Sequence, residues 1–147
     1  MVRNLPGILI RVMVGLVFMT EGLLKFLLPG ELGAGRFEHL GLPLPHLLAP
    51  AVGVVEVLGG AAVLFNLYAG DAALLLLAVM VGALLTTKLP ILLGHQIWRF
   101  EAPKLNHYGV LSFLHEARTD LCMVIGCLAV LAESGLKLFK KTKWYAR

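Results

Sequence analysis

Charged side chains inside apolar segments are the residues of this sequence most suited to chemistry. Arg11, Glu21 and Lys25 interrupt one apolar stretch, and Glu56 interrupts another. A charge at the centre of a bilayer costs about 2.5–3.5 kcal/mol even on insertion scales, so such groups turn toward a bundle interior and mark functional sites. A carboxyl group and an ammonium group in a dry pocket can bind a polar headgroup and handle a proton.

The first of these stretches predicts a helix with a polar stripe. Glu21 lies one turn before Lys25 on the flank of that stripe. Steps of three, four and seven residues place on one helical face Arg11, Gly15, Phe18, Gly22 and Lys25. This face should look toward the other helices and away from lipid.

The elements that must position these residues are membrane spans. The chain has 147 residues, 59% of them hydrophobic, and a mean hydropathy of +0.84, well above a soluble domain. Runs of about 20 apolar residues cross a bilayer. We therefore expect an all-α membrane protein, a four-transmembrane-helix bundle forming a single domain, with spans near 5–28, 47–68, 72–93 and 117–138.

The distribution of basic residues predicts the orientation. With four spans, both termini share one side with six Lys and Arg residues, against three on the other side. The positive-inside rule then makes both termini cytoplasmic. The basic tail 139–147 accounts for most of the net charge of +4 and suits anionic lipid headgroups. Its partner is therefore the lipid bilayer, and no nucleic acid is needed to explain the charge.

The two outer loops are too apolar or too long to be plain linkers. We expect a short interfacial helix around 36–40 in the first loop, and structure of its own in the loop 94–116. All five histidines lie in these loops or at their edges. Because none has His-x-x-x-His spacing, ordinary interfacial histidines are favoured over a metal site.

The third and fourth spans carry further charges near their outer ends. Lys88 either snorkels toward the interface or joins a buried ion pair. Glu116 opens the charged run of the fourth span and is expected near the headgroup region, and Arg118 and Asp120 are expected deeper than Glu116. Cys122 and Cys127 lie roughly 140° apart on a helix, so they should not bridge each other and are read as small apolar side chains.

Four basic residues balance four acidic residues in or at the edges of the spans. Glu56 is expected within reach of Arg11 or Glu21, and we take Arg11 as its partner to be tested. We predict a polar pocket that opens toward the outer loops, lined by Arg11, Glu21, Lys25, Glu56, Lys88, Arg118 and Asp120. The alternative is that these charges only fix the packing of the helices.

Three motifs in the first 65 residues resemble the DoxX family of small bacterial four-helix membrane proteins. They are Arg11-x3-Gly15-x2-Phe18-x2-Glu21-Gly22-x2-Lys25-Phe26, then Phe37-x3-Gly41-Leu42-Pro43-x-Pro45, then Val55-Glu56-Val57-Leu58-Gly59-Gly60. The resemblance implies a bacterial inner-membrane protein beside a redox partner or the quinone pool. It also implies that Arg11, Glu21, Lys25 and Glu56 are the recurring polar positions. The segment His115–Asp120 matches no motif of the family.

Two classes of function stay open. The first is a quinone-linked or oxidoreductase-associated membrane subunit, in which Arg11 or Lys25 binds a quinone carbonyl and Glu21 or Glu56 handles a proton. The second is a non-enzymatic small-solute transporter or a scaffold for a partner protein. No flavin, haem, iron–sulfur or metal motif is evident, so quinone is the one cofactor we consider, and the oligomeric state is left open.

Overall fold

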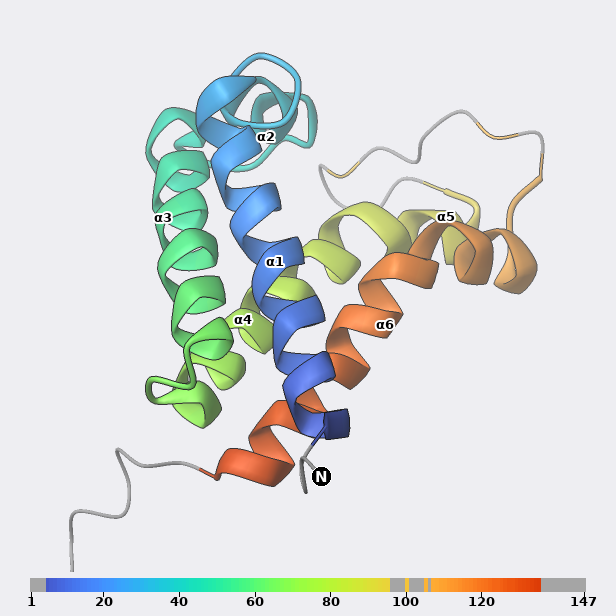
Figure 1. Ribbon diagram of the computed structural model, residues 1–147. Helices are drawn as coiled ribbons and strands as arrows, with labels where there is room; N and C mark the ends of the chain where they lie inside the picture. The colour runs from blue at the N-terminus through green and yellow to red at the C-terminus, as the bar shows by residue number, and fades with distance from the viewer. Residues whose placement is uncertain (1–4, 96–99, 101–104, 106, 136–147) are drawn as a thin grey trace, which may run out of the picture.

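The computed structural model describes residues 5–95, 100, 105 and 107–135 of the chain. All regular elements of this part are helices: α1 (Leu5–Leu27), α2 (Ala34–His39), α3 (Pro45–Leu64), α4 (Ala69–Ala83), η1 (Leu84–Lys88), α5 (Leu89–Leu93) and α6 (Val110–Ser134). Helices α1 and α3 lie antiparallel, and α2 covers one end of this pair (Figure 1). We call this end of the molecule the α2 end.

Three of the predicted spans are confirmed as helices that are long and apolar enough to cross a membrane. They are α1, α3 and the continuous 25-residue helix Ala69–Leu93, made of α4, η1 and α5. Helix α6 is also 25 residues long but carries four acidic or basic residues, so its passage through the membrane stays a prediction. It begins at Val110, seven residues before the predicted start.

The loop predictions meet the structure only in part. The short helix expected around 36–40 is present as α2, while its place at a membrane interface stays a prediction. Much of the loop 94–116 and the basic tail 139–147 lie outside the described residues. Residues 110–116 of this loop form the beginning of α6.

Glycines bring α1 and α3 into close contact. Gly15 lies against Gly60, and Gly22 lies against Gly53, so two glycines seven residues apart on each helix face each other. A Cβ atom at Gly22 would lie 2.7 Å from the carbonyl oxygen of Gly53. Small residues allow such close approach of helices in membranes. These contacts fix the register of the pair.

Gly60→Ala should destabilise the protein because its new methyl group has no room. The added Cβ would lie 2.8 Å from the Gly15 carbonyl oxygen and 2.9 Å from the Met19 backbone nitrogen. Overpacking of this kind costs about 1–3 kcal/mol. Gly82→Ala is the matched control, since nothing lies within 4 Å of a Cβ there. Thermal melts in detergent should show a lower Tm for Gly60→Ala only; equal melting temperatures would refute the tight contact.

The helix 69–93 widens into a π-turn at η1. The backbone N–H of Leu89 donates to the carbonyl oxygen of Leu84, five residues back. Pro90 follows one residue later and lacks a donor of its own. The hydroxyl groups of Thr86 and Thr87 donate to carbonyl oxygens of the preceding turn, on Gly82 and Ala83. Turns of this type often occur at functional sites.

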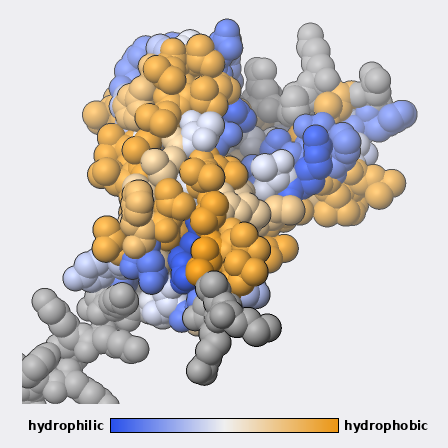
Figure 2. Space-filling model, viewed as in Figure 1, coloured by the Kyte–Doolittle hydropathy of each residue, from blue (hydrophilic) through white to orange (hydrophobic). Residues whose placement is uncertain are grey.

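The buried core lies mainly away from the α2 end. Its members come from four helices and are Val14, Phe18, Val63, Ala69, Ala73, Leu76, Met123, Cys127 and Val130. Toward the α2 end, α4, α5 and the start of α6 splay away from α1 and α3 (Figure 1). Apolar residues cover much of the visible surface, and hydrophilic residues gather at the α2 end and near the start of α6 (Figure 2).

Candidate functional site: a charged pocket between the helices

A pocket of about 530 Å³ lies between the pair α1–α3 on one side and the helix 69–93 and α6 on the other. Its walls come from α1, α3, α4, η1 and α6, and α2 adds Arg36, Phe37 and, just beyond its end, Leu40. Most of the lining is apolar, but seven charged residues share it: Glu21, Lys25, Arg36, Glu56, Lys88, Glu116 and Asp120. Mixed charges in an apolar cavity are typical of a binding site for a small ligand.

The tightest interaction in the pocket joins Lys25 to Glu56. The Lys25 Nζ atom lies 2.6 Å from Glu56 Oε2, and the two side chains are only 10% and 7% exposed. The same ammonium group also contacts the carbonyl oxygen of Glu21 at 3.4 Å. Side chains of a helix lean toward its N-terminus, so in this antiparallel pair both meet near the Gly22–Gly53 contact. The close approach of the two glycines therefore positions the ion pair.

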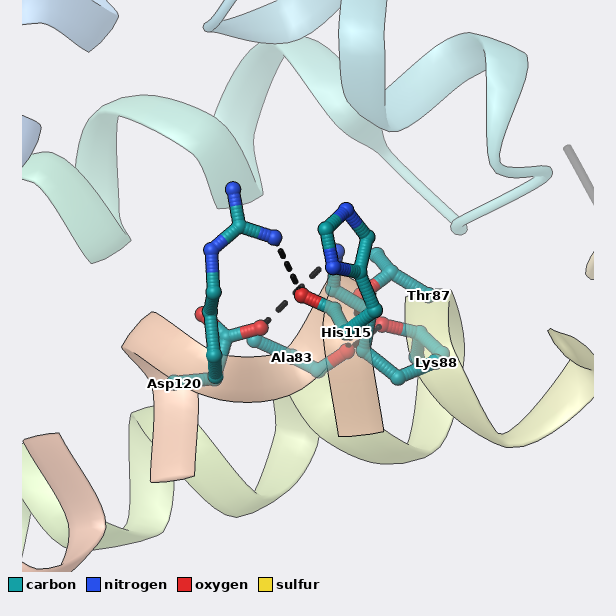
Figure 3. A network of polar contacts seen from close by, with 7 residues as sticks. Ala83, Thr87, Lys88, His115 and Asp120 are labelled. Atoms are coloured by element: carbon teal, nitrogen blue, oxygen red, sulfur yellow. Dashed lines mark hydrogen bonds and ion pairs between the residues drawn. The ribbon is translucent and has the colours of Figure 1, made fainter. Parts of the chain in front are cut away.

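A second and looser pair lies on the opposite wall. The Lys88 Nζ atom, carried by the π-turn, lies 3.9 Å from Asp120 Oδ2 on α6, beyond hydrogen-bond distance (Figure 3). The two side chains are 17% and 25% exposed. Of the two alternatives for Lys88, the ion pair is present in the structure.

Three further charged groups line the pocket without an ion pair to any described residue. They are Glu21, Arg36 and Glu116, from α1, α2 and α6. Charged groups from α1, α2, α3, η1 and α6 therefore line one cavity.

Two of the predicted pocket residues lie elsewhere. Arg11 is bound to Glu133 of α6 at 3.1 Å, toward the end opposite α2, so the predicted pairing of Arg11 with Glu56 is wrong. The physical reason is the register of α1 and α3, which places Lys25 beside Glu56. Arg118 does not line the pocket; its guanidinium group donates to the carbonyl oxygen of His115 one turn earlier.

Some residues of the pocket were not among the predicted set. Arg36 enters through α2, and its signal was a single cation in a loop too apolar for a solvated linker. Glu116 lies four residues before Asp120, so both share one helical face, and both line the pocket. Thr86, Thr87 and Thr119 add hydroxyl groups to the lining.

The cysteines and histidines contribute nothing evident to this pocket. Cys122 and Cys127 are free thiols, as their spacing predicted. Within the described ranges, no three residues among His, Cys, Asp and Glu are grouped so that they could hold a metal ion.

Long apolar helices around a charged internal pocket define an integral membrane protein of the all-α class. The chain belongs to the DoxX family, whose model matches residues 7–89. This match extends past the 65 residues that carry the resemblance in the sequence. It includes the Gly15–Gly60 and Gly22–Gly53 contacts, the Lys25–Glu56 pair and the π-turn.

Two further proteins are similar to this chain. The chain is 43% identical over 124 residues to the uncharacterized membrane protein Rv3486 of Mycobacterium tuberculosis, covering 84% of this chain and 72% of that protein. It is 31% identical over 83 residues to CatD of Bacillus subtilis, whose name describes it as a candidate oxidoreductase, covering 56% of this chain and 59% of CatD. No solved structure matches this chain.

Proposed function

We propose that the protein is a quinone-linked or oxidoreductase-associated membrane subunit whose pocket binds the polar headgroup of a membrane-dissolved quinone. The observation that carries the proposal is the gathering of seven charged residues from four long helices and α2 around one cavity with apolar walls. A flat ring with two oxygen atoms and an apolar tail matches such a lining. The name of CatD supports a redox setting.

The same proposal includes the finer topology. Helix α6 forms the fourth span, because its charged residues Glu116 and Asp120 line the pocket and are thereby turned away from lipid. Both termini lie in the cytoplasm of a bacterial cell, by the excess of basic residues on their side. The pocket then opens in the outer half of the inner membrane, and a redox protein partner would exchange electrons with the quinone there.

A binding measurement tests the proposal. Wild-type protein in lipid nanodiscs, titrated with a short-chain radiolabelled benzoquinone, should bind saturably at one site per chain. Glu21→Gln should weaken binding while leaving the Tm unchanged, because the exposed Glu21 carboxylate makes no ion pair with a described residue. Arg118→Gln is the control outside the pocket, and it should bind as the wild type does.

Absence of saturable quinone binding would reject the proposal. Uptake of a small solute by proteoliposomes would then favour the transporter. Recovery of a stable complex from native membranes, with no ligand bound, would favour the scaffold.

A further inference from the structure

The Lys88–Asp120 and Lys25–Glu56 pairs differ in whether their charged groups are already hydrogen-bonded to each other. At 2.6 Å, Lys25 and Glu56 satisfy each other, and Lys25 has a second acceptor in the Glu21 carbonyl oxygen. At 3.9 Å, Lys88 and Asp120 attract each other but share no hydrogen bond. No other side chain of the described residues forms a hydrogen bond with the Lys88 ammonium group or the Asp120 carboxylate.

The polar side chains near Lys88 and Asp120 already donate hydrogen bonds to backbone carbonyl oxygens. The hydroxyl groups of Thr86 and Thr87 donate to backbone carbonyl oxygens of Gly82 and Ala83. Arg118, close in sequence to Asp120, donates to the His115 carbonyl oxygen. Lys88 and Asp120 therefore present a strong donor and a strong acceptor side by side on the pocket wall, both still available to a ligand.

One oxygen atom placed beside the pair can reach both charged atoms. An oxygen about 2.8 Å from both the ammonium nitrogen and the carboxylate oxygen spans a separation of 3.9 Å with roughly a right angle at the bridging atom. A hydroxyl group in this place accepts from Lys88 and donates to Asp120. A carbonyl oxygen accepts from Lys88 but faces the Asp120 carboxylate with no hydrogen to give.

We infer that Lys88 and Asp120 together bind a hydroxyl group of the ligand, so the pocket prefers a dihydroxylated ring, the hydroquinone, over the corresponding quinone. This inference rests on the proposed function and deepens it by naming the form of the ligand that binds best. A hydrogen bond to a charged acceptor contributes enough for about a tenfold difference in Kd. Lys25 and Glu56 hold the helices together and do not discriminate between the two forms.

Binding of three ligands to the protein in nanodiscs, measured under anaerobic conditions, tests the inference. The ligands are a short-chain hydroquinone, the corresponding quinone, and the dimethyl ether of the hydroquinone, which keeps both oxygen atoms but cannot donate a hydrogen bond. Wild type should bind the hydroquinone about tenfold more tightly than either of the others. Asp120→Asn should remove most of this preference with quinone binding retained, and Lys88→Met should weaken all three. Arg118→Gln should behave as wild type.

The readout is the ratio of the Kd for the quinone to the Kd for the hydroquinone. Partial unfolding of a variant lowers the number of binding sites but leaves this ratio unchanged. Equal binding of hydroquinone and quinone by the wild type would overturn the inference and leave the proposed quinone site standing. A tenfold preference that survives in Asp120→Asn would also overturn it. If the wild type bound none of the three ligands, both the inference and the proposed function would fall.

Discussion

Glu56→Gln and Lys25→Met should each destabilise the folded protein by about 3–5 kcal/mol, because each leaves one charge buried without its partner. Their double variant should recover part of that loss. The two side chains are 7% and 10% exposed and their charged atoms lie 2.6 Å apart. Neither can reach water easily, so the penalty for breaking the pair falls on the fold. Thermal and denaturant melts in detergent measure it as a double-mutant cycle.

The Arg11–Glu133 pair supplies the matched cycle. It also joins two helices at hydrogen-bond distance, 3.1 Å, but Glu133 is 34% exposed. An exposed pair contributes at most about 1 kcal/mol, so Arg11→Gln and Glu133→Gln should have small effects. Strictly additive losses for Lys25→Met and Glu56→Gln would contradict the pairing in α1 and α3. A strong coupling between Arg11 and Glu56 would restore the pairing that the sequence suggested.

Gly82→Trp should abolish ligand binding by filling the pocket while the protein stays folded. Gly82 lines the cavity, and a Cβ atom there meets nothing within 4 Å. An indole group in this space displaces a ring-sized ligand, so the Kd should rise at least about a hundredfold, the equivalent of two steps of 1.4 kcal/mol. The binding titration and a melt of the same sample measure the two effects.

Leu75→Trp is the control for this substitution. Leu75 lies on the same helix, is 51% exposed and does not line the pocket, so its replacement should leave binding unchanged. Loss of binding in both variants would mean that any tryptophan on α4 disturbs the protein. Retention of binding in Gly82→Trp would place the ligand outside the cavity.

Helix positions and the polar character of the pocket could be predicted from sequence because both follow from local rules. A run of apolar residues sets the length of a span, and a charge inside it must turn inward. These rules placed Glu21, Lys25, Glu56, Lys88 and Asp120 on helix faces that line one cavity. The resemblance to the DoxX family came separately, from three motifs in the first 65 residues, and the family match confirmed it.

The partners of these charges depend on how the helices meet, which the local rules do not contain. Arg11 and Lys25 lie on the same stripe of α1, so either could reach Glu56 until the register is known. The register comes from the contacts Gly15–Gly60 and Gly22–Gly53. The sequence contains their equal spacing of seven, but only a paired reading of both helices would have used it.

The sequence predicted neither the early start of α6 nor the position of α2 over the pocket. The charged run from Glu116 to Asp120 is typical of the end of a membrane span, so the helix was expected to begin at 117, although it begins at Val110. The run lies inside the helix because the pocket accepts Glu116 and Asp120. Arg36 was expected in the short helix around 36–40, but no local pattern shows that this helix, α2, folds over the cavity.

The most direct test of the account is to map where a ligand binds along the chain. Wild-type protein in nanodiscs would be labelled with a photoreactive short-chain quinone, and the modified peptides identified by mass spectrometry, with unlabelled quinone as competitor. We expect adducts on pocket residues such as Val17, Met80 and Met123, a decrease of these adducts when unlabelled quinone is added, and their loss in Gly82→Trp. Adducts confined to outward-facing residues such as Leu75 and Ile125, or adducts that unlabelled quinone does not reduce, would contradict it.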